Sequence, residues 1–178
     1  MDTREILEKV KNGSITVEEA ERIFRRQPFE EMGYAKLDTH RKLRSGFPEV
    51  VFCSGKATEH ILHIYQKLYE ENGEVFGTRA SAEQYEALRP HLPKLEYDPL
   101  SRIMKIEKPE KEHAGKIAVC TAGTADIPVA EEAAQTAEYF GSYVERIYDV
   151  GVSGIHRLLS RVEMIQSANC VIAIAGME

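Results

Sequence analysis

Three apolar runs, separated by two helical segments, most constrain how this chain can fold. The runs are Ile117–Cys120, Tyr143–Tyr148 and Cys170–Gly176, and the segments between them are Asp126–Phe140 and Gly154–Ala168. Strands that are apolar on both faces and that alternate with helices are typical of a parallel sheet covered on both sides. We therefore predict an α/β fold in which these three strands pair in parallel.

The residues before Lys108 predict a separate, small α/β domain, which we name the leader domain (residues 1–107). A capping box of Thr16 and Glu19 begins one of its helices, and Ser81 caps another. Residues 108–115 are charged, contain Pro and Gly and have no apolar period, which predicts a linker to a second domain, residues 116–178. The side chains expected to be buried in the leader helices are Ile6, Leu7, Val10, Val17, Ala20, Ile23, Phe24, Ile61, Leu62, Tyr65, Leu68 and Tyr69.

Charge and composition exclude several classes of function. The net charge of −6 does not favour a nucleic-acid partner. No stretch approaches the roughly 20 apolar residues of a membrane span. Met1–Arg26 is charged throughout and lacks the apolar centre of a secretory signal. We expect a cytoplasmic protein that binds neither nucleic acid nor a membrane.

The three cysteines predict neither a disulfide framework nor a metal site. Cys53, Cys120 and Cys170 are far apart in the sequence, without the paired spacing of metal ligands. Cys120 and Cys170 have apolar neighbours within predicted strands, so we expect both to be small buried hydrophobes rather than nucleophiles.

Polar, glycine-rich loops follow all three predicted parallel strands. They are Thr121–Asp126, Asp149–Arg157 and Ala175–Glu178. Ligands of open parallel sheets bind beyond the carboxyl ends of the strands. We therefore expect the three loops to line one crevice.

The first loop offers backbone N–H groups where a helix begins, which is a ready site for an anion. It lacks the lysine and glycine pattern of the phosphate loop, so it does not predict a Mg²⁺–nucleotide site. Pro128 suits the first turn of that helix. Asp126 is expected either to contact a ligand or simply to cap the helix, and the two roles are compatible.

The second and third loops carry candidates for close ligand approach and for proton transfer. Gly151, Gly154 and Gly176 permit a ligand to come near the backbone. A histidine has an ordinary pKa of about 6.5, so His156 is suited to proton transfer at neutral pH. Taken alone, however, the second loop favours the simpler interpretation, in which His156 is an exposed residue in the first turn of a helix. Glu178 supplies a carboxylate at the same edge of the sheet.

Together, these segments resemble a known enzyme superfamily. "TAGTADIPVAEEAAQTAEYFG", "VERIYDVGVSGIHRLL" and "CVIAIAGME" are similar to the start of the carboxylase/mutase domain of the PurE superfamily. The closer resemblance is to the LarB family of PurE-related carboxylase/hydrolases. The stretch "KLDTHRKLRSGFPEVVFCSGK" resembles the leader domain of that family, which PurE lacks. The resemblance implies that the parallel strands belong to a flavodoxin-like sheet.

The resemblance also carries over residue roles. The first PurE loop reads G-S-x-S-D, whereas this chain keeps the aspartate, Asp126, and has neither serine. His156 and Arg157 match the His–Arg pair after the second strand, and "AGME" matches the start of the third glycine loop. By resemblance and position, the residues expected to bind substrate are Thr121, Ala122, Gly123, Thr124, Asp126, Asp149, Gly151, Ser153, Arg157 and Gly176. Those expected to serve catalysis are Asp126, His156 and Glu178.

The implied reaction uses nicotinic acid adenine dinucleotide and carbon dioxide. It yields pyridinium-3,5-biscarboxylic acid mononucleotide and AMP, in the synthesis of the nickel-pincer cofactor. No cofactor is firmly implied, and a need for Mg²⁺ is left open. In the family, a cysteine thiolate beyond the "AGME" loop adds to the pyridinium ring. The resemblance further implies a homo-oligomer, an octamer in PurE-like domains.

Because the expected cysteine and the later strands would follow Glu178, we expect these residues to be an N-terminal portion of the enzyme. Alone, it should be inactive and aggregation-prone or dependent on a partner. The alternatives are an aminoimidazole ribonucleotide carboxylase of purine synthesis and a nucleotide-binding module without activity. A cluster of Asp38, His40, Arg41 and Arg44 in the leader is expected either to meet the anionic dinucleotide or to be a solvated turn.

Overall fold

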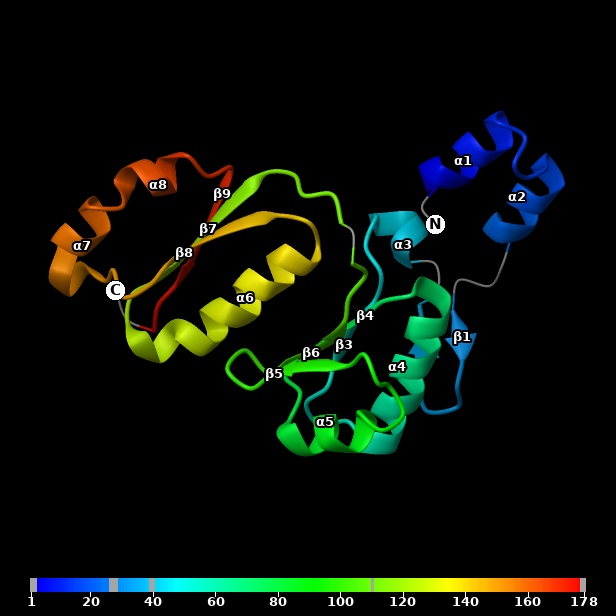
Figure 1. Cartoon of the computed structure of the whole chain (residues 1–178), viewed down its shortest axis with the longest axis horizontal. Coiled ribbons are helices and arrows are strands. Elements are labelled where there is room, and N and C mark those ends of the chain that lie inside the picture. The colour runs from blue at the N-terminus through cyan, green and yellow to red at the C-terminus, as the bar shows by residue number, and fades with distance from the viewer. Residues whose placement is uncertain (1–2, 26–28, 39–40, 110, 177–178) are drawn as a thin grey trace.

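The computed structural model describes residues 3–25, 29–38, 41–109 and 111–176. It is an α/β fold that combines helices with sheets containing parallel strands, as predicted. Figure 1 shows helix α6 (Ile127–Tyr139) lying between a three-stranded sheet and a four-stranded sheet. The four-stranded sheet lies within residues 50–106 and the three-stranded sheet within residues 116–174. The predicted domain boundaries at 107/108 and 115/116 stay predictions.

The three-stranded sheet is parallel, which confirms the central prediction from the sequence. Its strands are β7 (Lys116–Thr121), β8 (Tyr143–Ile147) and β9 (Cys170–Ile174), in the order β8-β7-β9. Ala118 lies opposite Glu145 on one side and opposite Val171 on the other. All three strands therefore end at the same edge.

Helices cover both faces of this sheet, because alternate residues of its strands are apolar on each face. On one face, Val119 packs against Ala130 and Ala134 of α6. On the other, Ala118 and Ile147 pack against side chains of α7 (Ile155–Leu159) and α8 (Val162–Gln166). The predicted single helix over 154–168 is wrong. The hydroxyl of Ser160 donates to the carbonyl oxygen of Arg157, which competes with the helical bonding pattern where α7 ends.

Two further expectations about the second domain need correction. Helix α6 begins one residue later than predicted, because Thr124–Asp126 form a separate 3₁₀ turn, η1. Strand β9 is less buried than its apolar sequence suggested, and Cys170 is exposed rather than buried. Strand β9 lies at the outside of the sheet, so part of its surface stays open to solvent.

The four-stranded sheet forms the centre of the leader domain. Its strands β3 (Val50–Phe52), β4 (Val75–Thr78), β5 (Glu96–Asp98) and β6 (Ile103–Ile106) have the order β3-β4-β6-β5. Only the β3–β4 pair is parallel, and α4 (Thr58–Asn72) connects these two strands. Tyr65 and Leu68 of α4 are buried against the sheet, as predicted. Gly73, with a φ of 67°, ends the helix in the left-handed conformation.

The remaining leader elements are short. They are α1 (Thr3–Lys11), α2 (Val17–Phe24), β1 (Glu30–Glu31), β2 (Lys36–Leu37), α3 (Arg41–Ser45) and α5 (Ala82–Leu88). The capping boxes that begin with Thr16 and with Ser81 are both present. Ile6 and Ala20 are buried as predicted, but Leu7, Val17 and Phe24 are exposed. The physical reason is visible in Figure 1, where α1 and α2 pack on each other and project from the rest of the leader.

In the predicted linker, Lys111 contacts both the leader domain and α6. The Lys111 Nζ lies 3.1 Å from Glu74 Oε2, 3.1 Å from Glu107 Oε1 and 3.3 Å from the centroid of the Tyr139 ring. It also donates to the carbonyl oxygen of Tyr139 at 2.6 Å, at the carboxyl end of α6. Within the described ranges, no helix has the length and apolar character needed to cross a bilayer.

Candidate functional site

The three candidate loops leave the same edge of the parallel sheet. In the register of the sheet, Cys120 of β7 pairs with Ile147 of β8, and Thr121 pairs with Ile174 of β9. The loops after these residues therefore start side by side. The central strand, β7, places its loop between the other two.

Thr121 joins the first loop to the second. Its hydroxyl oxygen accepts a hydrogen bond from the backbone N–H of Asp149 at 2.9 Å, and its carbonyl oxygen accepts one from Val150 at 2.9 Å. The residue is only 1% exposed. Thr121 therefore fixes the start of the second loop and does not present its hydroxyl to a ligand.

Ala122 links all three strand ends. Its N–H donates to the carbonyl oxygen of Ile174 at 3.1 Å, and its carbonyl oxygen accepts from the N–H of Gly151 at 2.9 Å. A Cβ atom at Gly151 would lie 2.7 Å from the Ala122 oxygen. Glycine is thus required there by the close approach of two backbones, rather than by a ligand.

Asp126 occupies the position before α6, but it is not a simple helix cap. Its Oδ2 accepts a hydrogen bond from the N–H of Gly123 at 3.1 Å, and it makes no side-chain cap bond to α6. The carboxylate therefore closes the first loop on itself. Thr124, between the two residues, is exposed to solvent. No side chain caps α6, but the N–H of Ile127 already donates to the carbonyl oxygen of Thr124 and Pro128 has no N–H.

The second loop holds an ion pair on a strained backbone. Asp149 has a φ of 59°, in the left-handed region, and its carboxylate pairs with the guanidinium of Arg157. A Cβ atom at Gly154 would lie 2.6 Å from Arg157 Nε, so the guanidinium packs directly on the glycine backbone. These two contacts hold Arg157 in place while its side chain stays 36% exposed.

The other candidates are at or near the surface. Ser153 and His156 are exposed on the second loop and the first turn of α7. Gly176 is exposed, and nothing lies within 4 Å of where its Cβ would be. Glu178 and His40 lie outside the described residues. In the leader, the Asp38 carboxylate pairs with Arg44.

None of the three cysteines faces the loops with an activated thiol. Burial raises the pKa of Cys53 and the pKa of Cys120, so both thiols favour the neutral form. Cys170 is exposed but pairs with Ile117, at the opposite end of the sheet from the loops. The rise of a strand puts about 13 Å between it and the loop edge.

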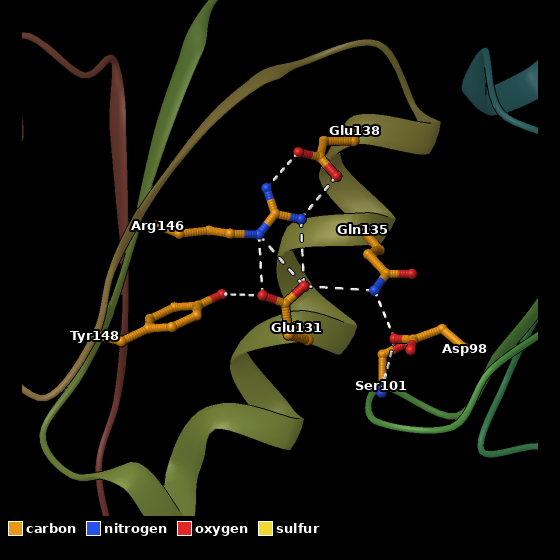
Figure 2. A network of polar contacts seen from close by, with 7 residues as sticks. All are labelled: Asp98, Ser101, Glu131, Gln135, Glu138, Arg146 and Tyr148. Carbon is orange, nitrogen blue, oxygen red and sulfur yellow. Dashed lines mark hydrogen bonds and ion pairs between the residues drawn. The ribbon is translucent and has the colours of Figure 1, made fainter.

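Sequence reasoning missed a polar network on α6, shown in Figure 2. Arg146 of β8 donates to the carboxylates of Glu131 and Glu138, and Tyr148 donates to Glu131 at 2.9 Å. Gln135 lies on the same face of α6 as Glu131 and Glu138. A signal was present, because residues 131, 135 and 138 share one face of a helix and residues 146 and 148 share one face of a strand.

The network also favours the ionised form of its carboxylates. Burial alone would raise the pKa of Glu131, but hydrogen bonds from Arg146 and Tyr148 outweigh it and the pKa is lowered. Burial likewise favours a higher pKa for Asp98, and bonds from Ser101 and Gln135 lower it. Within the part of the chain that the structure describes, no group of three His, Cys, Asp or Glu side chains could hold a metal ion.

Comparison with known proteins places the chain in a family. The profile of the LarB/PurE-like N-terminal domain matches residues 29–108. The uncharacterized protein MJ0165 of Methanocaldococcus jannaschii is 37% identical over 187 residues, a match that covers 98% of this chain and 72% of that protein. The chain therefore belongs to the LarB/PurE-like family.

Proposed function

We propose that this chain contributes the leader and the first three strands of a LarB-type carboxylase/hydrolase. Its substrate would be nicotinic acid adenine dinucleotide, which it would carboxylate on the pyridinium ring and hydrolyse at the phosphoanhydride. The products would be pyridinium-3,5-biscarboxylic acid mononucleotide and AMP. The proposal assigns substrate binding and proton transfer, but not the attacking thiolate, to the described residues.

One observation carries the proposal: the loop that holds the Asp149–Arg157 pair is hydrogen-bonded to Thr121 and Ala122, where the first loop begins. The guanidinium favours anions, because its N–H groups pair with phosphate oxygens. A dinucleotide brings two adjacent phosphates, which Arg157 of the second loop would bind beside the first loop. This arrangement suits a pyrophosphate better than a neutral ligand.

The chemistry divides between a thiolate and a base. A pyridinium ring is electron-poor, so a thiolate must add to it before a ring carbon can attack carbon dioxide. After the new carbon–carbon bond forms, the ring loses a proton to a base, and departure of the thiolate restores the aromatic ring. His156 is our candidate for that base, because it is exposed beside Arg157 on the same loop. None of the three cysteines suits the role of that thiolate. Cys53 and Cys120 are buried, and Cys170 lies at the end of the sheet away from the loops.

A second candidate, carboxylation of aminoimidazole ribonucleotide, is less well supported. The matched leader domain favours the LarB branch of the family. In addition, Gly123 and Ala125 stand in the loop where serines would hold the monophosphate of that substrate.

The test uses the complete product of the gene, supplied with nicotinic acid adenine dinucleotide and bicarbonate. We expect release of AMP and incorporation of labelled carbonate into the ring. His156→Ala should reduce carboxylation at least about 100-fold without unfolding the protein. Wild-type turnover by that variant would remove the catalytic role of His156. No turnover of the dinucleotide by the folded wild type would reject the proposed reaction in favour of a binding module.

A further inference from the structure

The network on α6 reaches across to the leader domain. The Gln135 Nε2 donates to Asp98 Oδ2 at 2.7 Å, and Asp98 ends strand β5 of the leader sheet. The same nitrogen lies 3.4 Å from Glu131 Oε2. Because both partners are carboxylates, the amide nitrogen must face them, and its two N–H groups can serve one each. Gln135 thus bridges the leader to the face of α6 shown in Figure 2.

From Glu131 the contacts continue to the candidate site. Glu131 Oε1 accepts from the Tyr148 hydroxyl at 2.9 Å, and the Glu131 side chain is only 14% exposed. Tyr148 directly precedes Asp149, whose carboxylate holds Arg157. A change at Asp98 can therefore reach the second loop through three hydrogen-bonded side chains: Gln135, Glu131 and Tyr148.

Further hydrogen bonds hold the leader end and the middle of this path, so a shift at Asp98 can displace the second loop. At the leader end, Asp98 also accepts from the Ser101 hydroxyl at 2.6 Å and the Ser101 N–H at 3.0 Å. In the middle, Arg146 of β8, two residues before Tyr148, holds Glu131, with its Nε 3.0 Å from Glu131 Oε1. Side chains locked by several hydrogen bonds position the groups that they contact more precisely than loops do.

We propose that Gln135, Glu131 and Tyr148 are positioning residues through which the leader domain fixes the second loop, and with it Arg157, for an anionic substrate. The inference rests on the proposed function only for its kinetic readout. It gives the leader domain a role that requires no direct contact with substrate. Of the three, Gln135 gives the clearest test of this role, because Asp98 and Glu131 are its only polar partners among the residues that the structure describes.

The test changes the donor character of residue 135 at nearly constant size. Gln135→Met removes both N–H donors, Gln135→Glu places a third carboxylate beside two others, and Gln135→Lys restores a group that can donate to both. The matched control is Gln166→Met, which makes the same change at an exposed position near the end of α8. All variants are made in the complete gene product.

The first readout is amide hydrogen exchange in residues 149–157, which needs no turnover. We expect exchange to rise about two- to thirtyfold in Gln135→Met, more in Gln135→Glu, and to return towards wild type in Gln135→Lys. The control should match wild type. Unchanged exchange in Gln135→Met, or no recovery in Gln135→Lys, would overturn the inference even if the dinucleotide is turned over.

A double variant tests whether the residues act in series. Tyr148→Phe removes only the hydroxyl at the site end of the path, so it should raise exchange in residues 149–157 as Gln135→Met does. If the path is continuous, Gln135→Met combined with Tyr148→Phe should be no worse than the stronger single variant. Effects that multiply would mean two independent supports, and the proposed path would be wrong. With an active enzyme, the single variants should raise KM for the dinucleotide more than they lower kcat.

Discussion

Single residues decide how closely the backbone of this fold can approach other groups, and two glycines show this most clearly. At Gly77 an added Cβ would lie 2.0 Å from the Tyr65 hydroxyl, which itself donates to the Met104 carbonyl at 2.8 Å in the leader core. At Gly151 it would lie 2.7 Å from the Ala122 oxygen. The first glycine serves stability and the second serves the junction of two candidate loops.

Gly77→Ala should lower the free energy of unfolding by about 1–3 kcal/mol, because the buried tyrosine must shift and its hydrogen bond weaken. Gly176→Ala is the control, since nothing lies within 4 Å of its Cβ position. Urea denaturation of both variants makes the comparison. Equal stability of the two variants would mean that the Tyr65 contact is not as close as described.

Gly151→Ala should leave the leader core intact and weaken dinucleotide binding about tenfold or more, because the loops after β7 and β8 would separate. Binding of the dinucleotide measured by calorimetry, with unfolding as a check, tests this. Wild-type affinity in a folded Gly151→Ala variant would show that the junction of the two loops does not matter for the ligand.

Sequence reasoning succeeded at the residue scale where one local rule decides the outcome. The Thr16 and Ser81 caps and the helix end at Gly73 each depend on neighbouring residues alone. It failed for Leu7 and Cys170, whose exposure depends on which other elements cover them. It also could not show that Thr121 is buried and bonded to Asp149 across 28 positions of sequence.

At the scale of elements, α6 has two different faces because it lies between two sheets. Its small residues, Ala130 and Ala134, pack on the parallel sheet. Its polar face carries Glu131, Gln135 and Glu138. The alternation of strands and helices predicted the parallel sheet, since that pattern is local. The contact of Gln135 with Asp98 could not be predicted, because Asp98 comes from the distant leader.

The lowered pKa of Glu131 predicts a pH-dependent contribution to stability. Its carboxylate has a lower pKa when folded than the ordinary 4.5, so its stabilisation is present above that value and is lost as pH falls through the folded pKa. Glu131→Gln should therefore cost about 1 kcal/mol near neutral pH and progressively less below about pH 4. Denaturation of both proteins across this range tests the sign. A cost that grew as the pH fell would contradict it.

At the scale of the whole molecule, Lys111 ties the segment after the leader to α6. Its ammonium meets Glu74, Glu107 and the last carbonyl of α6 at 2.6–3.1 Å, and its side chain is 15% exposed. A cation at the carboxyl end of a helix is also favoured by the helix dipole. The sequence predicted only a charged linker here, because composition does not show which charge finds a partner.

Lys111→Met should destabilise the protein by about 2 kcal/mol, because it leaves the buried Glu74 carboxylate without its cation, whereas Glu107 keeps Lys105. It should also increase proteolytic cleavage within residues 108–115. Lys108→Met, at an exposed position of the same segment, is the control. Cleavage of the Lys111→Met variant at the rate of this control would mean that the segment is held by other contacts.

The central claim is that the loops after β7 and β8 form one site for an anionic dinucleotide. The most direct measurement is hydrogen exchange of the complete gene product with and without nicotinic acid adenine dinucleotide. The account predicts slower exchange in residues 121–128 and 149–157, with Arg157→Ala abolishing the protection in both segments. Protection confined to the leader domain, or none at a saturating concentration, would contradict it.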